Sequence, residues 1–467
     1  MDYFEGGERL NLMQVLDNRE WREKYQKQLM ASFPTAVITS VKLNLPGPIK
    51  TSPKLQSVFQ IIINDLNPVF KDLQIIKEAS FVDQITGPEI FFVTSGCLKL
   101  VKKIMITFEE SHPLGRLMDL DVMCQNADKQ LSREELGFAP RKCLLCGKDA
   151  KTCIKEGNHS LAEGYSQINK MLHNFEKSKM IVPQMTQSQV VNAALTGMLY
   201  EVSLAPKPGL VDPISNGAHK DMTVFTFIDS SLALQPYLNE AYRIGNQFKG
   251  TDLPRMFSLL RNAGIRAEKD MFAATNGVNT HKGAVFSLGI MVTAVAYATQ
   301  KGITNLLTIQ KVISDMTQDL VKNDLGKNNL RNSQNRQTAG ERQFIKYKIP
   351  GVRGEAEKGF PIVMNLALPF LCKQQGNLNQ RLLNTLMKIA GNIDDTNLIK
   401  RAGNATISKD MQHWSMTFFQ IGGSYTPEGL EFLNDLDQMF IKRNLSMGGA
   451  ADNLILTIFL AILVGSL

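Results

Sequence analysis

The sequence lacks the long apolar run that a membrane-spanning protein needs. Its most apolar stretch, LILTIFLAILVGSL at residues 454–467, has fourteen residues, whereas roughly 20 are required to span a bilayer. The first stretch, MDYFEGGERLNLMQVLDNRE, also lacks the basic segment and apolar core of a secretion signal. We therefore expect a cytoplasmic protein without a membrane partner, in which the C-terminal run forms a buried helix.

Aromatic residues are few, and the positive charge is not concentrated. Phe, Trp and Tyr make up 7% of the residues, and the net charge of +8 comes from Lys and Arg residues scattered along the chain. Nucleic-acid-binding surfaces typically combine a basic stripe with interleaved aromatic residues. The composition therefore favours phosphate-bearing ligands only weakly, and we expect no nucleic-acid partner. A basic, zinc-containing nucleic-acid-binding protein is kept as the alternative from another class.

Cysteine is also scarce, with six in 467 residues, and without an export signal these thiols are expected to be reduced. Four potential metal ligands follow the spacing C-x2-C-x6-C-x5-H: Cys143, Cys146, Cys153 and His159. Three thiolates and an imidazole can form a tetrahedral zinc site, so the alternatives are structural zinc and plain reduced cysteines. The remaining three are expected to be small buried side chains: Cys97, Cys124 and Cys372.

The length and the hydrophobic pattern predict two domains. A chain of 467 residues exceeds the roughly 250 to 300 that a single core usually accommodates. In the first part, a helical period at residues 10–33 is followed by strand-like segments such as residues 35–45 and 89–94, whereas the second part shows helical periods throughout. We therefore predict a mixed α/β domain at residues 1–175, a linker at 176–185 and an all-α helical bundle at 186–467.

Two carboxylates interrupt the apolar stretch GRLMDLDVM. In a strand, Asp119 and Asp121 project from the same face while Leu120 packs behind them. Such a pair offers hard oxygen ligands for Mg²⁺, which can bridge phosphate oxygens; the alternative is a solvent-facing pair on an edge strand or turn. Upstream, Gly115 would let a phosphate approach the backbone, and Arg116 can fork onto it. This order of glycine and DxD resembles that of nucleotidyltransferases.

Five stretches of the first part extend this resemblance: LDNREWR, LNLPGPIKTSP, TGPE, EESHPLGRLMDLDV and RKCLLCGKDAKTC. Together they are similar to the apo-citrate lyase phosphoribosyl-dephospho-CoA transferase family (CitX). That family transfers a prosthetic group from its triphosphate donor onto a serine of the lyase acyl-carrier subunit, with loss of diphosphate. The resemblance implies that Asp119 and Asp121 hold the metal and that Arg116 contacts phosphate. It also suggests three further anion contacts: Arg19, Arg22 and Lys50.

Five polar clusters interrupt the helical second part. One of them places His281 and Lys282 at the start of an apolar helix, where free N–H groups and the helix dipole favour an anion such as phosphate. The clusters supply cationic, imidazole and carboxylate side chains: Lys207, Asp212, His281, Lys282, Arg353, Glu355, Asp394, Asp395 and Asp452. Each cluster alone can be a cap or a turn, but five in one helical bundle suit a metal-triphosphate site.

The stretches APKPGLVD, TNGVNTHKG, GVRGEA, DDTNL and GGAAD resemble the triphosphoribosyl-dephospho-CoA synthase family (CitG). In that family the ribose 2′-hydroxyl of 3′-dephospho-CoA displaces adenine from the anomeric carbon of ATP. Because the barrier is oxocarbenium-like, carboxylates near the ribose can stabilise charge and take the hydroxyl proton. The resemblance then suggests Glu201 and Glu355 as bases. It suggests Lys207, His281, Lys282 and Arg353 as phosphate contacts, and Asp212, Asp394, Asp395 and Asp452 as Mg²⁺ ligands.

The two resemblances support each other, because the product of the synthase family is the substrate of the transferase family. They imply a bifunctional transferase with ATP and 3′-dephospho-CoA as substrates and Mg²⁺ as its metal. The partner protein would be the apo acyl-carrier subunit of citrate lyase. The same chemistry for a malonate decarboxylase carrier is the nearest enzymatic alternative, although the segment HPLGRLMDLDV favours citrate lyase.

Overall fold

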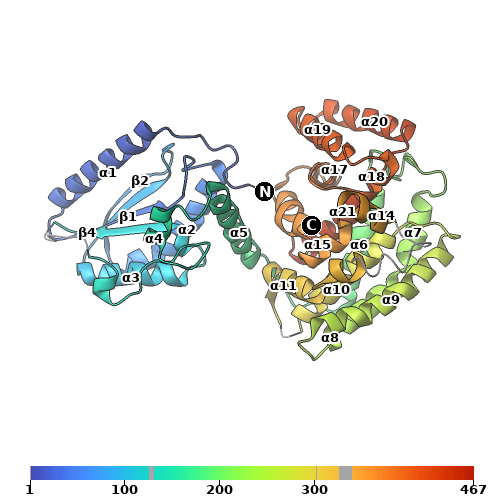
Figure 1. Ribbon diagram of the computed structural model, residues 1–467, viewed down its shortest axis with the longest axis horizontal. Coiled ribbons are helices and arrows are strands. Elements are labelled where there is room, and N and C mark those ends of the chain that lie inside the picture. Colours follow the sequence, from blue (N-terminus) through green and yellow to red (C-terminus); the bar gives the residue numbers. More distant parts are fainter. Residues whose placement is uncertain (1, 126–130, 301, 326–338) are drawn as a thin grey trace. The chain divides into compact units, whose positions relative to one another are not determined.

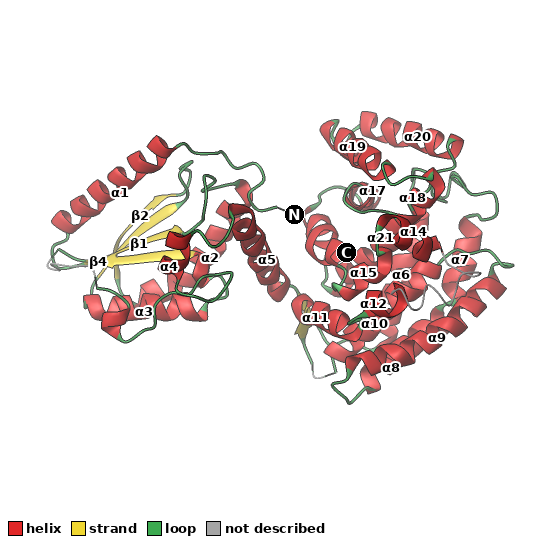
Figure 2. Cartoon of the chain, viewed as in Figure 1, coloured by secondary structure: helices red, strands yellow, loops and turns green. Residues whose placement is uncertain are grey.

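The computed structural model describes residues 2–125, 131–300, 302–325 and 339–467 of the chain. They form two compact units, Met1–Glu176 and Lys177–Leu467. The first unit contains a small sheet with helices, and the second is almost wholly helical (Figure 2). This contrast agrees with the predicted mixed and helical parts, while the predicted domain limits stay a prediction.

An antiparallel sheet of four strands, in the order β2-β3-β1-β4, forms the centre of the first unit. Its strands are β1 (Val37–Leu43), β2 (Ile75–Phe81), β3 (Glu89–Thr94) and β4 (Met118–Met123). The inner strand β3, EIFFVT, is buried at every position, whereas the edge strand β4 alternates between buried and half-buried positions over its first four residues. An edge strand whose one face is partly exposed to solvent can hold polar side chains without disrupting the core.

Helices cover both faces of this sheet (Figure 1). On one face, α2 (Pro53–Asp72) and α3 (Leu98–Ser111) share a core with Val41 of β1. On the other face, Leu29 of α1 (Leu12–Ser32) packs with Ile38 and Phe91. Successive strand residues point to opposite faces, which is why Ile38 and Val41 belong to different cores.

Short elements complete the first unit: η1 (Gly115–Leu117), η2 (Glu134–Leu136) and α4 (Ala150–Glu156). They are followed by α5 (Leu161–Lys179), whose Leu172 and Phe175 join the core that contains α2. The segment predicted as a linker contains the last residues of α5 and the short strand β5 (Ile181–Val182), which pairs with β6 (Thr304–Asn305).

The second unit is a bundle of helices. Its elements are α6 (Gln187–Ser203), α7 (Val224–Ala233), α8 (Gln235–Gln247), α9 (Leu253–Ala274), α10 (Lys282–Ala298), α11 (Leu306–Met316), α12 (Leu320–Leu325), α14 (Ala339–Tyr347), α15 (Gly351–Glu357), η3 (Val363–Ala367), α16 (Leu368–Lys373), α17 (Leu378–Ala390), α18 (Thr396–Ala402), α19 (Ile407–Gln420), η4 (Gly423–Tyr425), α20 (Pro427–Lys442) and α21 (Gly448–Leu463).

Two of these helices, α10 and α21, run through the core. Twelve of the 17 residues of α10 and eleven of the 16 residues of α21 are buried, as expected for helices that are apolar on all sides. A Cβ at Gly197 of α6 would lie 2.9 Å from the carbonyl oxygen of Ile455, so the close approach of α6 to α21 requires glycine there. The C-terminal run therefore forms the buried helix that was predicted. Within the described parts of the chain, no helix has both the length and the apolar character needed to cross a membrane.

Candidate active sites

The DLD segment occupies the edge strand β4, and its two carboxylates lie on the same face. In the antiparallel pairing with β1, Asp119 stands opposite Lys42 and Asp121 opposite Ser40, while Leu120 is buried on the reverse face in the core with α2 and α3. The face that carries the carboxylates is the face covered by α1, because Met123, two residues beyond Asp121, packs in the core beside α1.

A lysine joins the two carboxylates. The ammonium group of Lys42 donates hydrogen bonds to Oδ2 of Asp119 at 2.6 Å and to Oδ2 of Asp121 at 3.0 Å. Burial by itself lowers the pKa of Lys42, but Asp121 and Asp119 raise it above its ordinary value. Burial likewise raises the pKa of Asp119, yet Lys42 and then Arg141 bring it below its ordinary value. The two carboxylates thus converge on one point, which the ammonium group of Lys42 occupies.

This pair faces a cavity of about 620 Å³, which is also lined by Arg19 and Arg22 from α1. A second cavity of about 200 Å³ shares Arg19, Arg22, Lys42 and Asp119 with the first and extends to Lys50. The predicted anion contacts Arg19, Arg22 and Lys50 are therefore all near the DLD pair. Arg22 is held by a hydrogen bond from Nε to the buried carboxylate of Glu89 at 2.5 Å, and Lys50 by one from Nζ to the carbonyl oxygen of Leu45 at 2.5 Å.

Gly115 and Arg116 lie outside both of these cavities, as far as the chain is described. A Cβ at Gly115 would come within 2.1 Å of the carbonyl oxygen of Glu109, so packing against the end of α3 requires glycine there, and its role as a phosphate contact stays a prediction. The guanidinium of Arg116 donates to the carbonyl oxygen of Lys142. The arginine beside Asp119 is instead Arg141, whose Nη1 lies 3.6 Å from Oδ1 of the aspartate.

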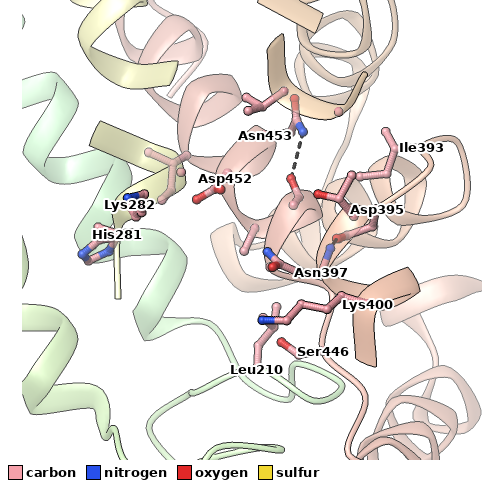
Figure 3. A pocket seen from close by; sticks show the side chains of 18 of the residues that line it. Leu210, His281, Lys282, Ile393, Asp395, Asn397, Lys400, Ser446, Asp452 and Asn453 are labelled. Carbon is pink, nitrogen blue, oxygen red and sulfur yellow. Dashed lines mark hydrogen bonds between the residues drawn. The ribbon is translucent and has the colours of Figure 1, made fainter. Parts of the chain in front are cut away.

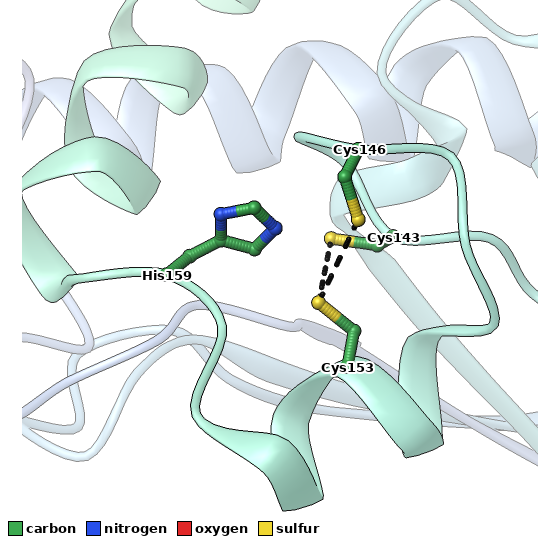
Figure 4. A group of neighbouring side chains, drawn as sticks. All are labelled: Cys143, Cys146, Cys153 and His159. Atoms are coloured by element: carbon green, nitrogen blue, oxygen red, sulfur yellow. Dashed lines mark hydrogen bonds between the residues drawn. The ribbon is translucent and has the colours of Figure 1, made fainter.

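The predicted cysteine and histidine ligands come together at one place. The potential ligand atoms of Cys143, Cys146, Cys153 and His159 all lie within 4.8 Å of one another. The sulfur of Cys153 is 3.5 Å from that of Cys143 and 3.7 Å from that of Cys146. Figure 4 shows the imidazole of His159 facing these three sulfurs. The expectation for Cys97 was wrong: this thiol is exposed at the N-cap of α3, while Cys124 and Cys372 are half-buried.

The helical unit contains a cavity of about 730 Å³. Figure 3 shows His281 and Lys282 at the start of α10 on one side of it, Asp395 and Lys400 on the other, and Asp452 between them. Seven of the ten residues predicted for this unit line the cavity: Glu201, His281, Lys282, Glu355, Asp394, Asp395 and Asp452. Three do not: Lys207, Asp212 and Arg353.

Lys207 lies behind the cavity wall, paired with Glu201. Its ammonium group donates to Oε1 and to the carbonyl oxygen of Glu201, both at 2.6 Å, and the two side chains are only 1% and 4% exposed. Asp212 accepts hydrogen bonds from the backbone N–H groups of Lys207 and Ser215, at 3.0 and 2.7 Å, and so fixes the loop. Arg353 is paired with Asp324 at 2.9 Å.

Asp395 is the N-cap of α18, and it also joins α18 to α21. Its Oδ1 accepts from the N–H of Asn397 at 2.8 Å, and its Oδ2 from the N–H of Ala450 at 3.0 Å. Burial raises the pKa of Asp395 in spite of these bonds. Burial also raises the pKa of Asp452, and the charges of Asp395 and Glu201 raise it further.

His281 is buried and neutral. Burial, with a smaller contribution from Lys207, lowers its pKa to about 3. The hydroxyl of Thr280 donates to Oγ of Ser230 at 2.7 Å, and that oxygen lies 2.8 Å from Nδ1 of the imidazole. The Ser230 hydroxyl therefore engages Nδ1, and the tautomer of the ring decides which of these two atoms donates. Among the described groups, none is hydrogen-bonded to Nε2, and the residue lines the cavity.

Five further polar side chains line the same cavity: His219 and Arg401, which belong to the polar clusters of the sequence, and Lys358, Asn397 and Lys400, which sequence reasoning missed. Arg401 donates to the carbonyl oxygen of Ala218 at 2.9 Å and to Oδ1 of Asn444 at 2.9 Å. Burial, and then the charge of Arg401, lowers the pKa of His219 to about 4. Lys400 sits in the last turn of α18, where cations commonly balance the helix dipole, so nothing in the sequence marked it as a ligand contact.

Glu355 projects from α15 into the cavity. Its Oε2 accepts one hydrogen bond, from the N–H of Ile362 at 3.3 Å, and burial raises its pKa. It therefore differs from Glu201, whose carboxylate is bonded to the ammonium of Lys207. Of the two carboxylates suggested as bases, Glu355 is the one whose pKa is raised, which favours it over Glu201 as a base.

Two family models match the chain in succession. Residues 10–175 match CitX, described as apo-citrate lyase phosphoribosyl-dephospho-CoA transferase, and residues 187–466 match CitG, described as ATP:dephospho-CoA triphosphoribosyl transferase. These matches agree with the two resemblances identified in the sequence. They favour citrate lyase over a malonate decarboxylase carrier, and neither supports a nucleic-acid-binding protein.

Curated relatives show the same order of regions. The chain is 98% identical to Protein CitXG of Leuconostoc mesenteroides subsp. cremoris over the full length of both proteins. It is 33% identical to Protein CitXG of Haemophilus influenzae, over 97% of this chain and 96% of the relative. The C-terminal 58% is 48% identical to a probable 2-(5''-triphosphoribosyl)-3'-dephosphocoenzyme-A synthase of Lactiplantibacillus plantarum, covering 96% of that protein. The chain belongs to the CitXG family, the fusions of CitX and CitG, and is a bifunctional transferase in the maturation of the citrate lyase prosthetic group.

Proposed function

We propose that the two reactions of the family take place at separate sites: one in the 730 Å³ cavity of the helical unit, and the other in the two adjoining cavities beside the DLD pair. The helical region, residues 186–467, makes the triphosphoribosyl precursor from ATP and 3′-dephospho-CoA and releases adenine. The nucleotidyltransferase-like region, residues 1–175, transfers the phosphoribosyl-dephospho-CoA group to a serine of the apo acyl-carrier subunit and releases diphosphate; residues 176–185 connect them. The observation that carries this proposal is the 730 Å³ cavity, which gathers residues from segments as distant as Glu201 and Asp452.

The triphosphate of ATP binds among the cations of this cavity. Lys282, Lys358, Lys400 and Arg401 line it. The helix α10 begins there with no side-chain hydrogen bond from its N-cap residue His281, within the described chain, whereas the first turn of α21 is already bonded to Asp395. Free N–H groups and the helix dipole then add to the attraction for phosphate oxygens. The remaining cavity wall is left for 3′-dephospho-CoA.

Glu355 acts as the base of the synthase reaction. It takes the proton of the dephospho-CoA ribose 2′-hydroxyl while that oxygen bonds to the anomeric carbon of ATP. The bond from this carbon to N9 of adenine breaks, and the leaving adenine takes up a proton from solvent. A carboxyl whose pKa is raised by burial is better matched to this task than one paired with an ammonium. Glu201, held by Lys207, instead offers fixed negative charge to the oxocarbenium-like centre.

In this proposal the ring proton of His281 is on Nε2, a buried nitrogen without a hydrogen-bond partner in the described chain, and it is donated to a substrate. A neutral imidazole with a pKa of about 3 brings no positive charge to the triphosphate, so we assign it to an acceptor atom of the substrate, such as a purine nitrogen. The chain of hydrogen bonds through Thr280 and Ser230 fixes the ring. The sequence suggested His281 as a phosphate contact; in this proposal it instead forms a directional hydrogen bond to another part of the substrate.

The helical cavity fits a divalent cation only together with substrate phosphates. Both oxygens of Asp395 already accept backbone hydrogen bonds, and Asp212 does not line the cavity. Among the described residues, no three carboxylates approach as closely as the cysteine and histidine ligands do. Asp394 and Asp452 remain, and Mg²⁺ is commonly held by one or two carboxylates plus phosphates.

In the transfer cavity, Asp119 and Asp121 hold the divalent cation, which neutralises charge on the triphosphate donor when bound. The convergence of both carboxylates on Lys42 supports this fit. The cations around the pair bind the donor phosphates: Arg19, Arg22, Lys42, Lys50 and Arg141. The carrier serine oxygen bonds to the phosphorus nearest the ribose, its proton is released, and diphosphate departs.

Adenine release tests the first reaction, and carrier mass tests the second. The purified chain is given ATP, Mg²⁺ and 3′-dephospho-CoA, adenine is measured by chromatography, and apo carrier protein is then added for intact mass measurement. We expect adenine, followed by a carrier mass gain equal to one phosphoribosyl-dephospho-CoA group. A folded chain that releases no adenine would overturn the synthase proposal, and adenine without a carrier mass gain would overturn the transferase proposal.

A further inference from the structure

The segment that follows the DLD strand folds without a core of its own. Between residues 131 and 160, all of them described, Cys153 is the only buried residue. Ile154 next to it is 81% exposed. A stretch of 30 residues with so little buried apolar surface cannot offset the entropy of ordering by hydrophobic burial alone.

Yet the backbone of this segment is regular around its cysteines. The N–H of Cys143 donates to the carbonyl oxygen of Lys148 at 2.7 Å, and the N–H of Gly147 donates to the carbonyl oxygen of Cys143 at 3.3 Å. Gly147 has φ of +72°, a conformation that glycine adopts without strain. The resulting tight turn brings the sulfurs of Cys143 and Cys146 to the same side, facing Cys153 in α4 (Figure 4).

The distances among the sulfurs fit a shared metal ion. Two thiolates bound to zinc at about 2.3 Å, at the tetrahedral angle, lie about 3.8 Å apart. The observed separations from Cys153 are 3.5 and 3.7 Å, whereas a disulfide would require about 2.05 Å. His159 supplies a fourth ligand, because its Nε2 is buried and has no hydrogen-bond partner in the described chain. An imidazole nitrogen left unpaired beside three thiols is accounted for by a metal.

The same turn carries Arg141, two residues before Cys143. Its guanidinium pairs with Glu109 and lies 3.6 Å from Asp119, and its carbonyl oxygen accepts from the N–H of Ala150, the first residue of α4. Glu109 in turn accepts from the backbone N–H of Leu120, at 3.3 Å. The position of the arginine beside the DLD carboxylates therefore depends on how the cysteine segment is folded.

We propose that Cys143, Cys146, Cys153 and His159 bind one structural zinc ion, and that this ion holds Arg141 against the carboxylates of the transfer site. Four protein ligands close the coordination sphere, as in structural rather than catalytic zinc sites. The ion takes the place of the missing core, as metals do in other small coreless segments. The first half of the proposal is independent of the reaction, and the second half rests on the proposed transferase function.

Metal content tests the first half. We measure zinc and iron by mass spectrometry of the purified full chain, and of the variants Cys146→Ser, Cys153→Ser and Cys97→Ser. The wild-type chain and Cys97→Ser, a control with the same substitution at an exposed thiol of the same unit, are expected to hold one zinc per chain, and the other two to hold less than a tenth of that. A zinc-free or iron-loaded wild type, or equal loss in the control, would overturn the site. Hydrogen-exchange protection of the strands β1 to β4 shows whether the first unit stays folded in each variant, because adenine release reports only on the second unit.

Zinc removal tests the second half. After chelation, transfer from isolated donor should show a KM for the donor raised about tenfold, restored by zinc but not by extra Mg²⁺. If zinc acts through Arg141, then Arg141→Ala raises this KM similarly, and chelation of that variant raises it no further. Unchanged KM after proven zinc loss, or additive effects in Arg141→Ala, would overturn the positioning role. A zinc-loaded wild type that never modifies the carrier would refute the transferase proposal and leave the metal site standing.

Discussion

Replacing Gly283 by alanine tests whether Asp452 belongs to the synthase site. Gly283 lies in the first turn of α10, and a Cβ there would come within 1.9 Å of Oδ2 of Asp452 and 2.8 Å of its carboxyl carbon. An ordinary contact begins at 3.4 Å. The carboxylate must therefore move by about 1.5 Å, the difference between 3.4 and 1.9 Å.

This displacement should affect the rate far more than the stability. The atoms that yield belong to one side chain and not to the backbone, so the overpacking cost is at the low end of about 1 to 3 kcal/mol. The higher helix propensity of alanine, worth about 0.8 to 1.0 kcal/mol, offsets part of that cost. A shift of about 1 Å in a reacting group costs about 100-fold in rate. We therefore expect adenine release by Gly283→Ala to fall about 100-fold, while the melting temperature changes by less than about 5 °C.

Gly264→Ala is the matched control. Gly264 lies within α9, and the nearest atom to a Cβ there, the hydroxyl of Tyr237, is 3.6 Å away. This variant should keep the wild-type rate and gain slightly in stability. If Gly283→Ala releases adenine at the wild-type rate while folded, Asp452 has no part in the reaction. If both variants lose activity equally, the loss does not come from the contact with Asp452.

Three further outcomes are expected. Lys207→Met leaves the buried carboxylate of Glu201 without its partner and should lower the free energy of unfolding by about 3 to 5 kcal/mol in urea titrations; adding Glu201→Gln should restore most of it, and no restoration would contradict the pairing argument. Because the base must be deprotonated and burial raises the pKa of Glu355, adenine release should decline as the pH falls through that raised pKa, above the ordinary value of about 4.3. Glu355→Gln should remove this acid limb together with most of the rate, and a variant with an unchanged pH profile would exclude this base. Asp119→Asn should abolish carrier modification and leave adenine release intact, whereas loss of both in a folded chain would contradict separate sites.

Local patterns were sufficient to place the DLD carboxylates. The alternation of buried and half-buried residues along β4 follows from the strand period of two, so the shared face of Asp119 and Asp121 could be predicted from the sequence. Their partner Lys42 could not, because it lies 77 residues earlier in the chain. Strand pairing over that distance is set by the packing of the whole unit and leaves no signal near either residue.

In the helical cavity, too, the sequence alone could not show which charged residues are available to a ligand. Lys207 and Arg353 were predicted as phosphate contacts from their residue type and loop position, yet each is paired with a carboxylate of the protein, Glu201 and Asp324. The sequence around a lysine in a glycine- and proline-rich loop is the same whether the lysine binds a ligand or pairs with a neighbouring side chain. Only the fold decides which cations reach the cavity: it places Lys400 there, and also Lys282, although Lys282 is itself paired with Glu268 at 2.7 Å.

The separation of the two sites leads to a mixing experiment. All residues that line the synthase cavity belong to the second compact unit, and all that line the transfer cavities belong to the first. Asp119→Asn and Glu355→Gln therefore damage different reactions and should complement each other when the two variant chains are mixed with substrates and apo carrier. The triphosphate product made by the first variant must then diffuse to the intact transfer cavity of the second.

Dilution distinguishes diffusion from passage within one chain. In the mixture, the carrier mass gain should slow as both variants are diluted at a constant ratio, because the intermediate has to meet a second chain. If the wild-type chain releases its product freely, its carrier mass gain should also slow on dilution once the intermediate accumulates, because the intermediate must again diffuse to a transfer cavity. If each variant performs its own half of the reaction but the mixture never modifies the carrier, the intermediate does not leave the chain that made it, and the two cavities cannot be treated as independent sites.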